Sequence, residues 1–202
     1  MIQRYRICLQ GRRPLIMHNG AAGLDKRSPA NQEKDEVAKK RGRNRTIHDD
    51  ARLQELECQT SLWLDEQTGL PTIPPAALRS CIESAARKFK QGPQVREGLL
   101  VESIETFTYD QRLGKTVEEL SKTVQFTTNV VVQRNRIPRT RAKFDEWGVT
   151  FIVETDDELV DVPQLQRWLA IAGRRVGLGD WRPEKSGDYG RFDLVSISLL
   201  ED

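Results

Sequence analysis

The sequence predicts an α+β fold with a ferredoxin-like (RRM-like) core whose elements follow the order βαββαβ. Two observations carry this prediction. Residues 2–10, 99–109, 149–155 and 192–199 have the alternation or the β-branched and aromatic content of strands. Residues 74–91 and 163–172 instead place apolar side chains at helical spacing. A four-stranded antiparallel sheet with both helices on one face, and the opposite face free, satisfies this order.

Each core element follows from a local pattern. The first strand places Ile2, Ile7 and Leu9 among polar residues, which indicates a strand with one solvent-exposed face. The first helix opens at Pro74 and Pro75, since the missing proline amide is harmless in a first turn. Its apolar face consists of Leu78, Ile82, Ala85 and Phe89, and its expected end is Gly92 with Pro93. The second helix begins near Pro163 and carries Leu165, Trp168, Leu169 and Ala172.

Two insertions are expected within one domain spanning residues 1–202. Residues 11–60 are expected to form a mobile basic and helical insertion, because residues 11–45 are rich in glycine and charge and poor in large apolar side chains. A short helix is expected at 33–40. A further helix over 46–64 should run into a short strand. Residues 124–144 form two extended arms around Pro138, which predicts a projecting β-hairpin. No internal repeat or second core is evident.

Composition favours a compact cytoplasmic protein. Of 202 residues, 37% are hydrophobic and 31% charged, and no apolar run is long enough to span a bilayer. Met1 leads directly into an amphipathic strand without a signal-peptide pattern, so no membrane partner is expected. Cys8, Cys58 and Cys81 lack the spacing of a zinc site or a disulfide framework. We expect no cofactor and no metal.

The strongest functional signal is a row of cations in the predicted hairpin. No acidic residue lies between Leu120 and Lys143, although the net charge of the whole chain is only +2. Guanidinium groups at alternate positions of a strand share one face and suit phosphate oxygens. The alternative is an ordinary solvated basic hairpin. The cations concerned are Arg134, Arg136, Arg139, Arg141 and Lys143.

A second basic run, at residues 39–45, could attract a polyanion over long range. Its members are Lys39, Lys40, Arg41, Arg43 and Arg45. The alternative is a charged loop without a binding role.

A third segment, residues 173–192, combines glycines, arginines and aromatic residues. Glycines allow close backbone approach and can point successive amides at an anion, while aromatic rings offer surfaces on which a base stacks. The candidate ligand-binding residues are Arg174, Arg175, Trp181, Arg182 and Arg191. In the alternative interpretation this loop is a connector and Trp181 closes the edge of the core. The lysine and hydroxyl residue of a nucleoside-triphosphate loop are missing.

Catalysis has little support in the residues. His18 and His48 have no serine or cysteine in a nucleophile context, so both are expected to be ordinary loop residues. Residues 156–161 include four acids that could hold a metal, but their position before a helix favours capping.

Three features in order carry a family resemblance: the helix-opening stretch 73–79, the arginine-bearing hairpin and the loop 177–192. The chain resembles the repeat-associated RAMP superfamily of CRISPR proteins, particularly the backbone subunits that coat guide RNA. It is also similar to small proteins of tailed bacteriophages that begin with a Pro-Leu-(Ile/Leu)-Met-His-Asn stretch and end with a Gly-Arg-Phe strand, here residues 14–19 and 190–192.

The resemblance implies a ferredoxin-like palm, a hairpin thumb at 124–144, a glycine-rich loop and repeated subunits along a strand. The chain departs from the family at Pro75-Ala76-Ala77, where glycine and small hydroxylated residues are usual, so phosphate contact by this helix start is not expected. Some family members cut RNA with an aspartate in the loop after the first strand, and Asp25 is the residue that this implies here.

The expected function is therefore non-catalytic binding of single-stranded nucleic acid, RNA in preference to DNA, with self-association along the strand and with other subunits of a ribonucleoprotein complex as partners. The alternatives are a phage protein that binds or recombines single-stranded DNA, a metal-dependent ribonuclease using Asp25, and a protein-interaction subunit.

Overall fold

The computed structural model describes residues 1–40, 42–132 and 135–200. The chain divides into two compact units, which are taken separately below. The sheet unit comprises Met1–Ile16, Thr72–Asp110 and Phe144–Asp202, and the insertion unit comprises Met17–Pro71 and Gln111–Lys143. The sequence predicts one domain with insertions, whereas the structure gathers the inserted segments into a unit of their own.

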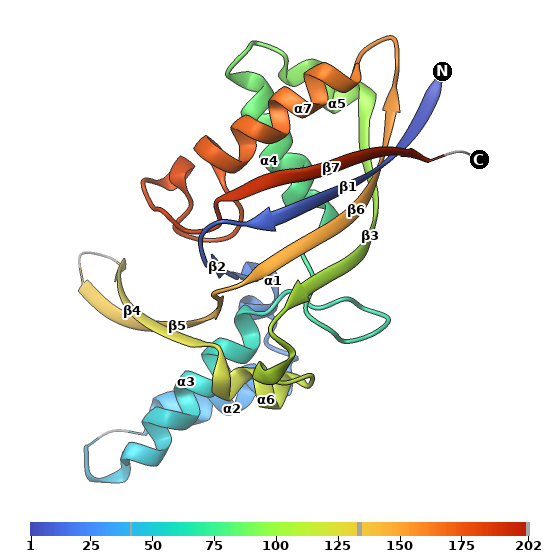
Figure 1. Ribbon diagram of the computed structural model, residues 1–202. Helices are drawn as coiled ribbons and strands as arrows, with labels where there is room; N and C mark the ends of the chain where they lie inside the picture. The colour runs from blue at the N-terminus through green and yellow to red at the C-terminus, as the bar shows by residue number, and fades with distance from the viewer. Residues whose placement is uncertain (41, 133–134, 201–202) are drawn as a thin grey trace. The chain divides into compact units, whose positions relative to one another are not determined.

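The sheet unit contains a four-stranded sheet in the order β3-β6-β1-β7 (Figure 1). Its strands are β1 (Ile2–Gly11), β3 (Leu99–Tyr109), β6 (Trp147–Asp156) and β7 (Phe192–Leu200), and each pairs with its neighbours in antiparallel fashion. The short strand β2 (Leu15–Ile16) follows β1. With α4 after β1 and α7 after β6, the order is βαββαβ, and the predicted ferredoxin-like fold class is confirmed.

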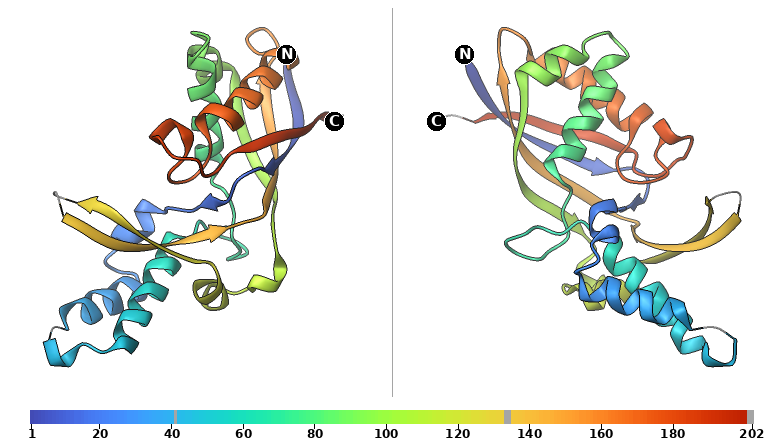
Figure 2. Two further views of the ribbon diagram at one scale, coloured as in Figure 1. Left: turned by 60° about the vertical axis from the view of Figure 1, so that its left-hand side comes forward. Right: turned by 180° about the vertical axis from the view of Figure 1, so that it is seen from behind.

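Helices α4 (Pro75–Arg87) and α7 (Val162–Ile171) lie on the same side of this sheet (Figure 2). The strand residues that face them are buried, for example Ile7 and Leu9 of β1 and Phe151 of β6. Trp168 of α7 is also fully buried, and its indole N–H donates to the Gln91 side chain at 2.9 Å. The apolar faces that strand alternation and helical spacing predict thus pack against one another in one core.

The prediction that Gly92 and Pro93 merely stop a helix is incomplete. α4 ends at Arg87, and a second short helix, α5 (Gly92–Gly98), starts at Gly92 with proline in its first turn. Proline is compatible with a first turn as well as with a helix end, so the sequence signal was ambiguous. After α7 the chain continues as a π-helical turn (Ala172–Val176), and a 3₁₀ turn (Pro183–Lys185) lies in the following loop.

The insertion unit is largely helical. It holds α1 (Gly20–Leu24), α2 (Pro29–Lys39), α3 (Ile47–Ser61) and α6 (Val117–Thr123), with 3₁₀ turns at Gly42–Asn44 and Gln111–Leu113. The helix predicted at 33–40 therefore begins earlier, at Pro29, and packs against α3. α6 was not predicted, although Thr116 and Glu119 form the capping box that such a spacing signals.

Strands β4 (Gln125–Val132) and β5 (Asn135–Phe144) pair in antiparallel register from Gln125↔Ala142 to Val132↔Asn135. Within the insertion unit, β5 is tied to the end of α3, because the Ala142 amide donates to the Ser61 hydroxyl at 2.8 Å. Both residues are buried. The hairpin is thus anchored at its base.

Among the helices in the described ranges, none has the length and apolar character needed to cross a membrane.

Candidate nucleic-acid interface

The cations of β5 form a basic row in the insertion unit. Arg139, Arg141 and Lys143 occupy alternate positions, which places them on one side of the strand about 7 Å apart at the usual rise per residue. Arg136 is exposed nearer the start of β5. Lys143 also lies over the Phe126 ring of β4, with 5.4 Å from its Nζ to the ring centroid. Arg134 of the predicted set lies outside the described residues.

Arg139 has a structural partner that the sequence did not indicate. Its Nη1 lies 2.6 Å from Oε1 of Glu57, whose other carboxylate oxygen accepts a 2.8 Å hydrogen bond from the Thr140 amide. The Glu57 side chain is only 10% exposed, while that of Arg139 is 46% exposed. One carboxylate on α3 therefore holds both the side chain and the backbone of β5, and Arg139 keeps a face toward solvent.

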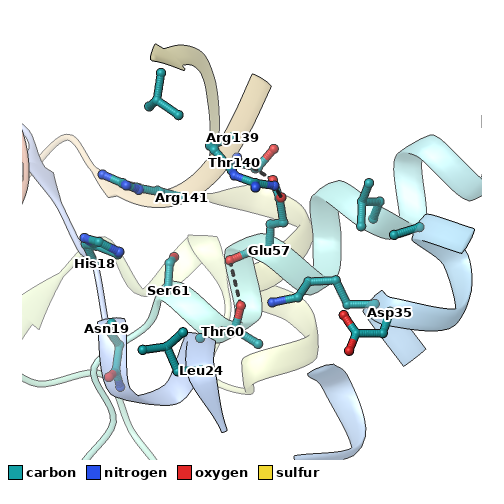
Figure 3. Close-up of a pocket in the computed structure, with 16 residues that line it drawn as sticks. His18, Asn19, Leu24, Asp35, Glu57, Thr60, Ser61, Arg139, Thr140 and Arg141 are labelled. Carbon is teal, nitrogen blue, oxygen red and sulfur yellow. Dashed lines mark hydrogen bonds and ion pairs between the residues drawn. The ribbon is translucent and has the colours of Figure 1, made fainter. Parts of the chain in front are cut away.

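A cavity of about 610 Å³ opens between α2, α3, the loop before α1 and the hairpin. Figure 3 shows His18 and Arg141 on one side of it, with Glu57, Arg139 and Thr140 near its upper wall. Lys34 and Asp35 of α2 and Thr60 and Ser61 of α3 also line it, and the two hydroxyls donate to carbonyls of their own helix. Its volume falls in the range of ligand-binding pockets, and guanidinium groups such as those of Arg139 and Arg141 suit anionic oxygens.

Two pKa shifts describe the electrostatics of this cavity. Partial burial and the nearby charge of Arg141 lower the pKa of His18 below its ordinary value of 6.5. Burial and the charge of Arg139 lower the pKa of Arg141, and Glu57 opposes this. Both shifts express the same condition: positive charge is crowded into a partly desolvated space. An anion entering the cavity would relieve that crowding.

The basic run at residues 39–45 lies at the end of α2 and before α3, and it is partly neutralised. Lys40 pairs with Asp49 at 2.6 Å, and Arg45 pairs with Asp50 at 2.7 Å. The lysine, together with hydrogen bonds from Thr46, lowers the pKa of Asp49. Lys39 and Arg43 are exposed, and Arg41 lies outside the described residues. None of the described cations of this run lines the cavity.

The glycine-rich loop belongs to the sheet unit, and its amides are directed inward. The amide of Leu178 donates to Gly190 (2.9 Å), that of Asp180 to Ile16 (2.8 Å) and that of Gly190 to Pro14 (2.7 Å). The prediction that successive amides point at an anion is therefore wrong for these three. The glycines instead permit close packing, since Gly190 has φ +65° and a Cβ there would collide with the Leu178 carbonyl.

The side chains of this loop divide into two groups. Arg182 pairs with Glu184 at 2.9 Å and also donates to the Gly179 carbonyl, and Arg191 pairs with Asp188 at 2.8 Å. Arg174 and Arg175 are exposed.

Trp181 is half-buried and tilted against Tyr189, with ring centroids 6.2 Å apart. It has a positive φ of 50°. The left-handed backbone and the partial burial are the properties expected of a connector residue that closes the edge of the core.

The sheet face away from the helices carries ion pairs. Arg4 reaches Glu102, and Arg6 reaches Glu105, each at 2.7 Å, across the intervening strand β6. The aromatic residues Tyr5, Phe107 and Phe151 are buried. This arrangement does not offer the stacking platform by which RNA-recognition domains bind bases, in agreement with the lack of that motif in the sequence.

The remaining catalytic and metal candidates have structural roles. Asp25 ends α1, and its carboxylate accepts a hydrogen bond from the Arg27 amide at 2.9 Å. Asp161 caps α7 through a capping box with Gln164, as predicted from its position before the helix. Burial raises the pKa of the Cys58 and Cys81 thiols to about 12. Within the described ranges, no group of three or more histidine, cysteine or acidic residues could hold a metal ion.

Sequence reasoning did not identify four titratable residues of the cavity: His18, Lys34, Asp35 and Glu57. His18 was taken for an ordinary loop residue, although it lies in the Pro14–Asn19 stretch shared with the phage proteins, and that was the available signal. Glu57 and Lys34 had no distinguishing pattern among the many charged residues of the insertion.

Comparisons with known proteins concern the fold. No protein-family model matches the chain, and no curated protein matches its sequence. Among solved structures, it is similar to a chain in the cryo-EM structure of the Type III-B Cmr-beta bound to cognate target RNA, with a TM-score of 0.54 and 12% identity. The match covers 99% of this chain and 61% of that chain. At this identity the similarity supports a shared α+β fold.

Proposed function

We propose that the protein binds single-stranded RNA through the β5 cations and assembles along the strand with further subunits. The observation that carries the proposal is the row formed by Arg139, Arg141 and Lys143 beside a cavity in which positive charge is crowded. Cations spaced along a strand suit a row of phosphates, whereas a single anionic ligand would need them clustered.

The fold adds support, because the similar chain comes from a structure described as bound to target RNA. RNA is proposed over DNA on that ground. Arg4 and Arg6 on the open sheet face are held in ion pairs, and three amides of the glycine-rich loop donate to backbone carbonyls. The insertion unit is therefore the best-supported region for contact with RNA. Recognition would therefore depend on phosphates and be nearly independent of sequence.

The test uses two variants that break the same ion pair with opposite changes of charge. Arg139→Ala removes a cation from the proposed interface, and Glu57→Gln removes its acidic partner while leaving Arg139 in place. Measured by fluorescence anisotropy with a labelled single-stranded RNA, Arg139→Ala should weaken binding for every sequence tested. Glu57→Gln should leave the affinity unchanged or raise it, because it adds net positive charge.

Salt dependence provides a second measurement. If the three cations each neutralise one phosphate, the slope of log K against log salt should be about −2, since single strands give roughly −0.7 per contact. Arg139→Ala should reduce the slope by about 0.7. An equal loss of affinity in both variants, or a slope near zero, would reject phosphate contact by Arg139.

Assembly along the strand is tested with RNA of increasing length. One hairpin contacts few nucleotides, so isolated footprints should be weak, and neighbouring subunits on one strand should bind cooperatively. Light scattering should show particles whose mass increases with RNA length. One copy per strand, held equally tightly on short and long RNA, would leave binding without assembly.

A further inference from the structure

The four-stranded sheet ends at β3 on one side and at β7 on the other (Figure 1). Among the described strands, β7 pairs with β1 alone. The outer side of an edge strand presents backbone N–H and C=O groups that can pair with another strand. Folded proteins usually protect such an edge with charged residues, proline or bulges.

The two edge strands differ in this protection. β3 carries Glu102 and Glu105, and its register with β6 shifts at two places. β7 has no charged residue and no proline from Leu194 to Leu200, and its register with β1 shifts once, at Val195. Segments with high β-propensity, no charge and no proline are those that pair readily through their backbone. β7 is therefore the edge that is open to a partner strand.

Two large apolar side chains of β7 are exposed, Val195 at 62% and Leu199 at 56%. They lie two residues to either side of Ile197, and the residues between are serines at both positions, Ser196 and Ser198. The segment is thus nearly palindromic about Ile197, with Val-Ser before it and Ser-Leu after it.

A palindromic edge strand fits a second copy of itself. In a two-fold contact the same surface of both copies meets, so residue i contacts j and j contacts i. Two antiparallel β7 strands related by an axis at Ile197 place this residue opposite its own copy and each serine opposite a serine. Val195 of each copy then lies opposite Leu199 of the other. Apolar cross-strand pairs stabilise a sheet, and no like charges oppose one another in this segment. The pairing covers both exposed apolar side chains.

We propose that the protein forms a two-fold dimer through β7, which joins two four-stranded sheets into one continuous antiparallel sheet. The contact requires no RNA and belongs to the sheet unit, whereas the RNA contacts proposed above belong to the insertion unit. A two-fold contact closes after two copies, so it adds to assembly along a strand and does not replace it. The paired segment is short compared with a standard interface, and the dimer should therefore be weak.

The experiment is sedimentation equilibrium of the full chain, treated with nuclease, over a range of protein concentrations. The apparent mass should rise with concentration to twice that of the chain and no further. Leu199→Lys places an ammonium group opposite Val195 of the other copy. Because the axis introduces this change twice, the Kd of the dimer should rise about tenfold or more. Leu100→Lys is the matched control, since Leu100 is 51% exposed on the opposite edge strand, and its Kd should equal that of the parent.

A pair of opposite charges tests the register. Val195→Glu combined with Leu199→Lys puts a carboxylate opposite an ammonium group twice in each dimer, so this double variant should dimerise more tightly than Leu199→Lys alone. Within one copy the two positions are about 13 Å apart in an extended strand, too far for an ion pair. Val195→Lys combined with Leu199→Lys puts like charges opposite one another and should stay monomeric.

Circular dichroism checks that each variant is folded. A parent protein that remains monomeric at every concentration overturns the proposal, as do masses beyond the dimer without RNA or equal masses of the two double variants. Leu199→Lys and Leu100→Lys add the same charge, so their affinities for a short RNA, measured by fluorescence anisotropy, should be equal. A weaker affinity of Leu199→Lys would assign β7 to the RNA contact and also overturn the proposal. Dimerisation and RNA binding can thus fail separately.

Discussion

The ion pair between Arg139 and Glu57 should contribute measurably to stability, although one partner lies in a surface hairpin. Arg139→Ala removes the 2.6 Å contact to a carboxylate that is 10% exposed, whose other oxygen keeps the hydrogen bond from the Thr140 amide. Loss of a hydrogen bond between charged groups costs about 1.5–3 kcal/mol. Because Arg139 is 46% exposed, solvent screens part of this, and we expect about 1–2 kcal/mol.

For a chain of this size, a loss of about 1–2 kcal/mol lowers the thermal midpoint by roughly 2–8 °C. Glu57→Gln should be milder, because the amide oxygen can still accept from Thr140 and the half-exposed Arg139 can turn to solvent. The assay is a double-mutant cycle with Arg139→Ala, Glu57→Gln and the double variant, followed by circular dichroism. The double variant should be no less stable than Arg139→Ala. The coupling energy is then at least as large as the cost of Glu57→Gln alone, about 1 kcal/mol.

Additivity of the two single changes within about 0.5 kcal/mol would refute this reasoning, because it would mean that the pair contributes nothing beyond its separate members. The sequence alone predicts that the hairpin lies outside the core, so that Arg139→Ala with Arg141→Ala would leave the thermal midpoint nearly unchanged. The near-complete burial of Glu57 is the reason for expecting otherwise at Arg139.

Three further predictions concern the fold. Gly190→Ala should destabilise the protein by about 2 kcal/mol or more in a denaturation assay, because Gly190 has a positive φ and no room for a Cβ. Gly20→Ala is the control: a Cβ added at Gly20 meets no atom within 4 Å, so stability should change by under about 0.5 kcal/mol. Thr46→Ala should cost about 1 kcal/mol through loss of the α3 cap, seen as reduced helicity at elevated temperature. The folded-state pKa of His18 lies below its ordinary 6.5, so the unfolded chain binds the proton first, and the free energy of unfolding should fall as pH drops below about 6.5. His18→Gln should flatten that part of the stability profile, and an unchanged profile would contradict the assignment.

Local patterns were sufficient for the four strands and the two long helices of the sheet unit. Alternation in β1 and β7 and helical spacing in α4 and α7 are properties of short stretches, and the order βαββαβ leaves few ways to bury their apolar faces. The capping role of Asp161 was equally local. The α5 and α6 helices were missed because each has seven residues, too few to show a periodic pattern.

The candidate site depended on contacts between distant segments. The sequence alone determined that β5 carries a row of cations, because that is a matter of spacing and of missing acids. Only the tertiary structure decided that Glu57, 82 residues before Arg139, neutralises one of them, and that His18 joins Arg141 at one cavity. It also turned the glycine-rich amides inward, because backbone hydrogen bonds in an irregular loop depend on which carbonyls the fold brings near. The amino-acid sequence determines which charges lie along a strand, whereas the tertiary structure determines which partner each charge meets.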